Sequence, residues 1–75
     1  MSKHDQYRRL ASSNRRIAET RERIEQQKAR VLELQGRPEC STAVQLLRTL
    51  DRALRLMTHG RAKLIRRLMN WPRYT

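Results

Sequence analysis

The chain has very few of the residues that stabilise small domains by special means. Its 75 residues include one cysteine, two glycines, two prolines, three aromatic residues and no phenylalanine. One cysteine excludes an internal disulfide bond, and two distant histidines do not have the spacing of a zinc site. Because a chain of this size buries only about 60% of its unfolded surface, we expect self-association to supply the missing stability.

Long apolar segments are missing as well. The opening MSKHDQYRRL has no run like that of a signal peptide. No stretch approaches the roughly 18–20 apolar residues of a membrane span. With the single thiol, this predicts a cytoplasmic protein. Because β-branched residues do not alternate with polar ones, we expect an all-α fold.

Apolar residues repeat with heptad spacing in both halves of the chain. In the first half, an aliphatic row is accompanied by a mostly polar row. In the second half, the residues at heptad spacing form one seam, by which we mean the row that should face the other helix, and it is apolar except for Arg61. The first-half rows are Leu10, Ile17, Ile24, Val31 and Ser13, Thr20, Gln27, Leu34; the second-half seam is Ala43, Leu47, Leu50, Leu54, Met57, Arg61, Leu64, Leu68.

A corner separates the two seams. Gly36 suits the C′ position after a helix, where a left-handed conformation is needed, and Pro38 cannot continue that helix. Ser41 or Thr42 is placed to cap the second helix, and Thr42 has the capping-box partner Gln45. A connection this short predicts an antiparallel αα-hairpin.

The predicted hairpin is one domain over residues 1–75 with frayed ends. Its helices cover about 5–35 and 42–70 around a turn at 36–41, and Pro72 ends the second helix at about residue 70. The numbers of facing residues should sum to about 77–78. This register pairs Val31 with Leu47, Ile24 with Leu54, and Leu10 with Leu68, and brings Tyr7 to Trp71 as an aromatic plug at the open end.

The net charge is +11, which favours anionic partners. Residues 1–36 carry nine basic and five acidic side chains, a net of +4, and residues 37–75 carry nine and two, a net of +7. Since 15 of the 18 basic residues are arginine, GC-rich coding is an alternative source of the charge.

The two helices carry their charge differently. In the first, an Arg row precedes the aliphatic row and has Glu neighbours at helical spacing, so we interpret it as a solvated shoulder. In the second, a one-signed ladder lies opposite the seam and is the better candidate for phosphate contacts. The Arg row is Arg9, Arg16, Arg23 and Arg30; the ladder is Arg48, Arg52, Arg55, Lys63, Arg66 and Arg67, with His59 among them.

A stripe of apolar and small residues flanks the second seam, formed by Leu46, Ala53, Leu56 and Gly60. Two hairpins pairing through it would form a homodimeric four-helix bundle. The same stripe, or an Arg row, could instead dock on a larger acidic protein, and attachment to a membrane surface is a weaker alternative.

Nothing in the sequence predicts catalysis. Cys40 and His59 have no partners at catalytic or ligand spacing, and no phosphate loop or metal motif is present. We expect no cofactor and no pocket of useful size. Arg61 is expected near Ser13, Asn14 and Ile17, where it would bond Asn14 and backbone carbonyls or turn outward to solvent, with binding of an anion as the alternative. The sequence therefore predicts a non-catalytic basic module that binds nucleic acid backbone, with a protein adaptor as the alternative.

A set of leucine-periodic elements spans residues 16–68: Ile17-Ala18 with Arg23-Ile24, Gln27, the leucine-rich turn ending in Gly36, Leu46-Leu47, and His59, Arg61 and Leu64 before Leu68. Through them the chain resembles a group of small, uncharacterised helical-hairpin proteins frequent in alphaproteobacteria. In that group His often directly precedes Arg and an acid lies near the final leucine, whereas here Gly60 intervenes and Arg66-Arg67 replace the acid. The resemblance implies a bacterial cytoplasmic hairpin and no activity.

Overall fold

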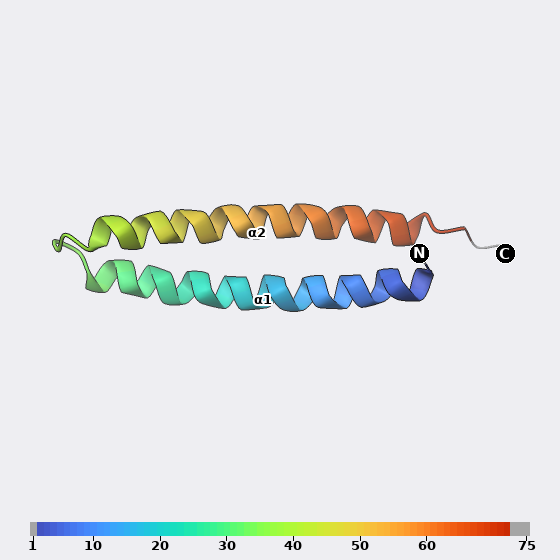
Figure 1. Cartoon of the computed structure of the whole chain (residues 1–75), viewed down its shortest axis with the longest axis horizontal. Helices are drawn as coiled ribbons and strands as arrows, with labels where there is room; N and C mark the ends of the chain where they lie inside the picture. The colour runs from blue at the N-terminus through green and yellow to red at the C-terminus, as the bar shows by residue number, and fades with distance from the viewer. Residues whose placement is uncertain (1, 73–75) are drawn as a thin grey trace.

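The protein is an antiparallel hairpin of two long helices in a computed structural model that describes residues 2–72 (Figure 1). Helix α1 covers Lys3–Glu33 and α2 covers Cys40–Met69. The two helices lie side by side over their whole length and form a thin rod (Figure 1). The predicted all-α hairpin is therefore confirmed.

Helix α1 begins two residues earlier than the sequence predicted. The Ser2 side chain caps it, because its Oγ accepts a hydrogen bond from the Asp5 N–H at 3.1 Å. Asp5 also places a negative charge in the first turn, where the helix dipole favours it. The expected fraying at residue 1 and at residues 73–75 falls outside the described residues.

The turn contains the one left-handed glycine of the described chain. Gly36 has φ +82°, and the Arg37 N–H donates to the Leu34 carbonyl across it at 3.0 Å. The left-handed conformation is as predicted, but the helix cap is Leu34, so Gly36 lies one residue beyond the expected C′ position.

The predicted cap of the second helix is wrong. Helix α2 begins at Cys40 with Glu39 at the N-cap and no side-chain cap hydrogen bond, so Ser41 and Thr42 already lie inside it. The turn starts the helix early, because the Cys40 N–H donates to the Arg37 carbonyl at 3.1 Å. At the other end α2 stops at Met69, before Pro72, as expected.

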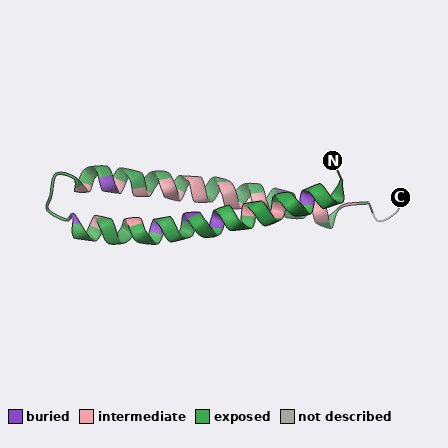
Figure 2. Ribbon diagram, turned by 60° about the horizontal axis from the view of Figure 1, so that its bottom comes forward, coloured by how far each residue is buried: buried purple, intermediate pink, exposed green. Residues whose placement is uncertain are grey.

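The predicted seams lie between the helices. The buried apolar side chains are Ile17, Ile24, Leu34, Ala43 and Leu64. In Figure 2 the buried positions face the opposite helix, and the outward sides of both helices are exposed.

The polar row of α1 belongs to this interface and extends one heptad further than predicted, to the buried Gln6. The Thr20 hydroxyl is 2.8 Å from the Arg16 carbonyl and 3.5 Å from the Met57 sulfur. Thr20 and Met57 sum to 77, the predicted register. Gln27 Nε2 donates to the Ala43 carbonyl at 2.8 Å, which ties α1 to the start of α2.

At the end of the hairpin opposite the turn, the residues that the sequence predicted there line a shallow hollow. Tyr7 and Trp71 both line it, together with Leu10 and Leu68. Tyr7 remains 51% exposed, and the Lys3 ammonium lies 5.9 Å from its ring centroid. The aromatic residues therefore border this end rather than close it completely.

Candidate nucleic-acid interface

The outward side of α2 carries the predicted ladder of basic side chains. All of its members are exposed, as expected for residues opposite an apolar seam. Asp51, the only acid between Cys40 and Met69, is half-buried, one turn from Arg48 and Arg55. We call this surface the basic face; it consists of Arg48, Arg52, Arg55, Lys63, Arg66 and Arg67.

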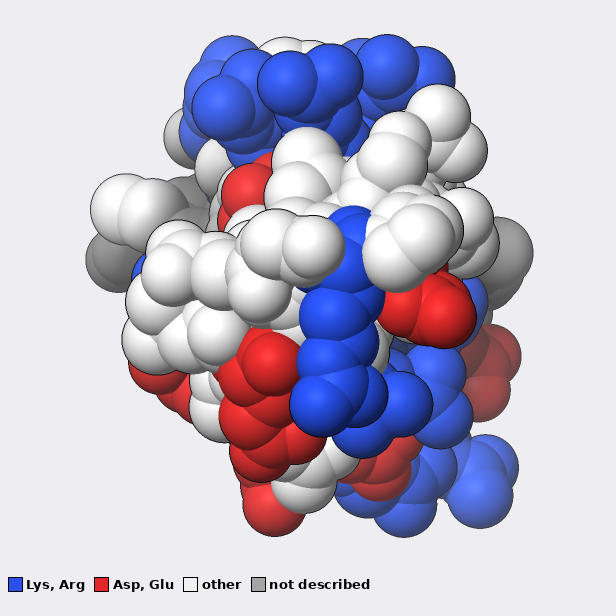
Figure 3. Space-filling view, turned by 90° about the vertical axis from the view of Figure 1, so that its left-hand side faces the viewer, with Lys and Arg blue, Asp and Glu red and all other residues white. Residues whose placement is uncertain are grey.

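The outward side of α1 has mixed charge instead. Its ion pairs include Glu25–Lys28 at 3.3 Å and Arg30–Glu33 at 3.6 Å, all four side chains being largely exposed. Viewed along the rod from the turn, Lys and Arg side chains cover the top of the molecule, over α2, while Asp and Glu side chains are mixed with them lower down (Figure 3). The single sign of charge is thus a property of α2.

The Arg row of α1 lies on the same side of the hairpin as the apolar stripe of α2. Arg23 and Arg30 line a shallow hollow with Leu46, and Arg9 and Arg16 line another with Gly60. The four arginines are exposed, as expected for a solvated shoulder. Sequence periodicity did not show that these two rows face each other across one groove.

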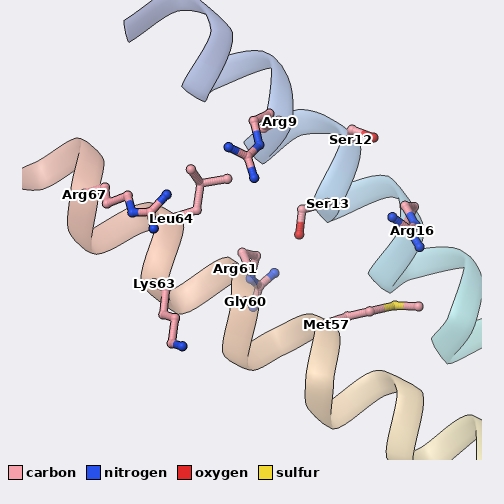
Figure 4. Close-up of a pocket in the computed structure, with 10 residues that line it drawn as sticks. All are labelled: Arg9, Ser12, Ser13, Arg16, Met57, Gly60, Arg61, Lys63, Leu64 and Arg67. Carbon is pink, nitrogen blue, oxygen red and sulfur yellow. The ribbon is translucent and has the colours of Figure 1, made fainter. Parts of the chain in front are cut away.

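A hollow with a volume of about 470 Å³ lies around Gly60 and is open to solvent. We call it the basic hollow, and Figure 4 shows its lining. From α1 come Arg9, Ser12, Ser13 and Arg16, and from α2 come Met57, Gly60, Arg61, Lys63, Leu64 and Arg67.

Arg61 is held where the sequence predicted. Its Nη1 donates to the Asn14 Oδ1 at 3.3 Å, across the interface. The side chain is half-buried, so it neither enters a closed core nor turns fully outward. It is the one basic residue of the α2 seam, and its hydrogen bond to Asn14 brings it to the side of α2 that faces α1.

The predicted oligomer interface is available to solvent in this single chain. Leu56 is 68% and Leu46 49% exposed, Ala53 is half-buried and Gly60 is exposed. A Cβ built at Gly60 would meet nothing within 4 Å, so another helix could approach closely there. Dimerisation stays a prediction.

Cys40 and His59, the two residues considered for catalysis or metal binding, lie far apart along α2. Cys40 is the first residue of α2, and its thiol donates to the Val31 carbonyl at 3.8 Å. His59 is exposed on α2. Among residues 2–72, no group of three or more His, Cys, Asp or Glu side chains could hold a metal ion. In the same range neither helix has an apolar stretch that could cross a bilayer.

Comparisons with known proteins gave no further basis for a function. No protein-family model matches the chain, and neither a curated protein nor a solved structure matches it. The resemblance to alphaproteobacterial hairpin proteins stays a prediction, and the function has to be argued from the residues themselves.

Proposed function

We propose that the protein is a non-catalytic module, acting in the cytoplasm, that binds the phosphate backbone of nucleic acid through the basic face. The observation that supports this most directly is the charge of that face. Six exposed basic side chains lie along the outward side of α2, and the helix has a single acid, which is half-buried. Contacts between such side chains and phosphates supply most of the affinity in sequence-independent binding.

The charge pattern is unfavourable in the free protein. Arg48 and Arg52 are neighbours at i,i+4, as are Lys63 and Arg67, and like charges at this spacing destabilise a helix by a few tenths of a kcal/mol per pair. The α1 surface offsets its basic charge with glutamates. Phosphates bound along α2 would replace this repulsion with attraction, and little base readout is expected because a straight outward face contacts backbone first.

Salt-dependent binding tests the proposal. Nuclease-treated protein is titrated into fluorescent DNA and RNA duplexes and single strands, and anisotropy is followed from low to physiological salt. If all six side chains contact phosphates of duplex DNA, log K should fall against log salt with a slope of about −5. Undetectable affinity for both DNA and RNA at low salt would refute the proposal.

Charge reversal locates the contact. The Arg52→Glu, Arg55→Glu double variant should lose binding at physiological salt, because it removes two central contacts and adds two repulsive charges. The matched control is Arg8→Glu, Arg15→Glu, which makes the same change of charge at exposed positions of α1. Equal loss in both variants would mean that net charge, and not the basic face, determines binding.

Docking on an acidic protein is the second candidate, supported by the exposure of Leu46 and Leu56. It predicts that one stoichiometric partner is retained after nuclease treatment and in high salt. Leu46→Ser with Leu56→Ser should release that partner and leave nucleic acid binding unchanged. Retention of the partner by this variant would exclude docking through the stripe.

A further inference from the structure

The basic hollow brings positive charge together from both helices. Arg9 and Arg16 reach it from α1, and Arg61, Lys63 and Arg67 from α2. Figure 4 shows Arg9 and Ser13 pointing toward the space between the helices, whereas Lys63 points away from α1. Arg61 reaches across to Asn14. No carboxylate is among the described side chains that line this hollow.

Small residues create the space. Ser13 occupies a seam position of α1 where a leucine would fill the interface, and Gly60 contributes no side chain from α2. A Cβ at Gly60 would find nothing within 4 Å. Met57 and Leu64 form the apolar part of the lining. The hollow therefore exists because Ser13 and Gly60 are too small to fill the space between the helices.

Arg61 is the residue that the fold alone does not explain. The other seam positions of α2 are apolar, whereas Arg61 places a charged group at the edge of the interface. Its hydrogen bond to Asn14 lies in an exposed position and uses one of the five N–H groups of a guanidinium. An anion in the hollow would receive further donors from this side chain.

We propose that the basic hollow binds a phosphate group. Guanidinium groups match phosphate oxygens bidentately, and serine hydroxyls are additional donors. The volume of about 470 Å³ leaves room for the atoms attached to the phosphate. The site shares Lys63 and Arg67 with the basic face, but it depends on α1 and on Arg61, so it goes beyond the proposed function and can fail while binding through Arg52 and Arg55 holds.

The phosphate has two sources, a small polyphosphate-like ligand or the backbone of a nucleic acid. A neighbouring hollow shares Lys63 and Arg67 with the basic hollow and is also lined by Trp71. Trp71 is the only tryptophan of the chain, so its fluorescence reports on this neighbouring hollow. A nucleic acid strand that continues from the basic hollow would change this signal, whereas a ligand confined to the basic hollow would not.

The direct test is a titration of the full chain with sodium pyrophosphate at constant ionic strength, followed by ¹H–¹⁵N NMR. The amides of Ser12, Ser13, Gly60 and Arg61 should shift in a saturable way, and the amides of Arg52 and Arg55 should not. Uniform small shifts along both helices would mean general screening and would overturn a site in the hollow.

A comparison of two single variants, Arg61→Leu and its control Arg55→Leu, makes the test specific. Arg61→Leu should weaken pyrophosphate roughly tenfold or more, and should raise the midpoint of thermal unfolding without ligand because leucine completes the seam. Arg55→Leu removes the same charge from the basic face and should leave pyrophosphate affinity unchanged. Equal weakening in both variants, or none in Arg61→Leu, would refute the site.

Oligonucleotides separate the two sources and the two proposals. If a single strand shifts the Ser13 and Gly60 amides and changes Trp71 fluorescence in an Arg61-dependent way, the site holds a backbone phosphate. If only pyrophosphate shifts these amides in an Arg61-dependent way, the ligand is small. If neither ligand depends on Arg61, the hollow is refuted, and binding that depends on Arg52 and Arg55 would still support the basic face.

Discussion

At the scale of single residues, the polar row of α1 fixes how the two helices are aligned. Gln27 donates to the Ala43 carbonyl across the interface, and Thr20 contacts Met57. An apolar seam with a seven-residue repeat tolerates slippage by one heptad, because leucines would again meet leucines. Directional contacts favour one register over the others, as polar residues at seam positions do in coiled coils.

Gln27→Ala tests this role. The variant should lower the free energy of unfolding by about 1 kcal/mol, because a part-buried cross-helix hydrogen bond is lost. Urea unfolding followed by circular dichroism measures the change. Gln26→Ala is the control, since Gln26 is exposed on the same helix turn and should have little effect. An equal change in both variants would mean that the Ala43 contact contributes nothing.

At the scale of the elements, the two glycines have opposite structural roles. Gly36 adopts a left-handed conformation in the turn, with φ +82°. Gly60 lies inside α2 with ordinary helical geometry and open space where a side chain would be. One glycine is required by the backbone, and the other lowers the stability of its helix.

The same substitution should therefore change stability in opposite directions. Gly36→Ala should destabilise the hairpin by about 1 kcal/mol, because an alanine is strained at positive φ. Gly60→Ala should stabilise it by about 1 kcal/mol, because alanine has the higher helix propensity and its Cβ meets no neighbour. Thermal unfolding at low protein concentration compares the two. Destabilisation by Gly60→Ala would indicate that a partner helix packs closely against this glycine.

At the scale of the whole molecule, the hairpin exposes more surface than a compact protein of its mass. Its accessible area is 6380 Å² for 9.0 kDa, whereas a typical folded monomer of that mass exposes about 4,900 Å². Among residues 2–72, five apolar side chains are buried, so a second copy packed along the apolar stripe would enlarge a small core. The charge of +11 on each chain opposes that association.

Self-association should therefore respond to salt in the direction opposite to nucleic acid binding. Light scattering after size exclusion should give twice the mass of 9.0 kDa, and the dimer should strengthen with salt as repulsion is screened. Leu46→Glu with Leu56→Glu should yield monomers, and Leu32→Glu, at a 66% exposed position of α1, should not. A wild-type monomer at high protein concentration and high salt would contradict the bundle.

The start of α2 is a feature that the sequence alone did not predict correctly. Thr42 and Gln45 had the spacing of a capping box, yet α2 begins at Cys40 without a side-chain cap. The spacing was a valid local signal, but a backbone hydrogen bond across the turn, from Cys40 to Arg37, started the helix first. At the first helix the signal was present and overlooked, because Ser2 is a standard capping residue.

The sequence by itself determined two helices, a corner, the interface residues of each helix and the outward direction of the basic face. Each of these follows from the period of residues along one helix. Only the tertiary structure decided that Arg9 and Arg16 meet Gly60 and Arg61 around one hollow. Which flanks of two helices share a side depends also on the hand of the hairpin, and the periodicity of a single helix does not contain it.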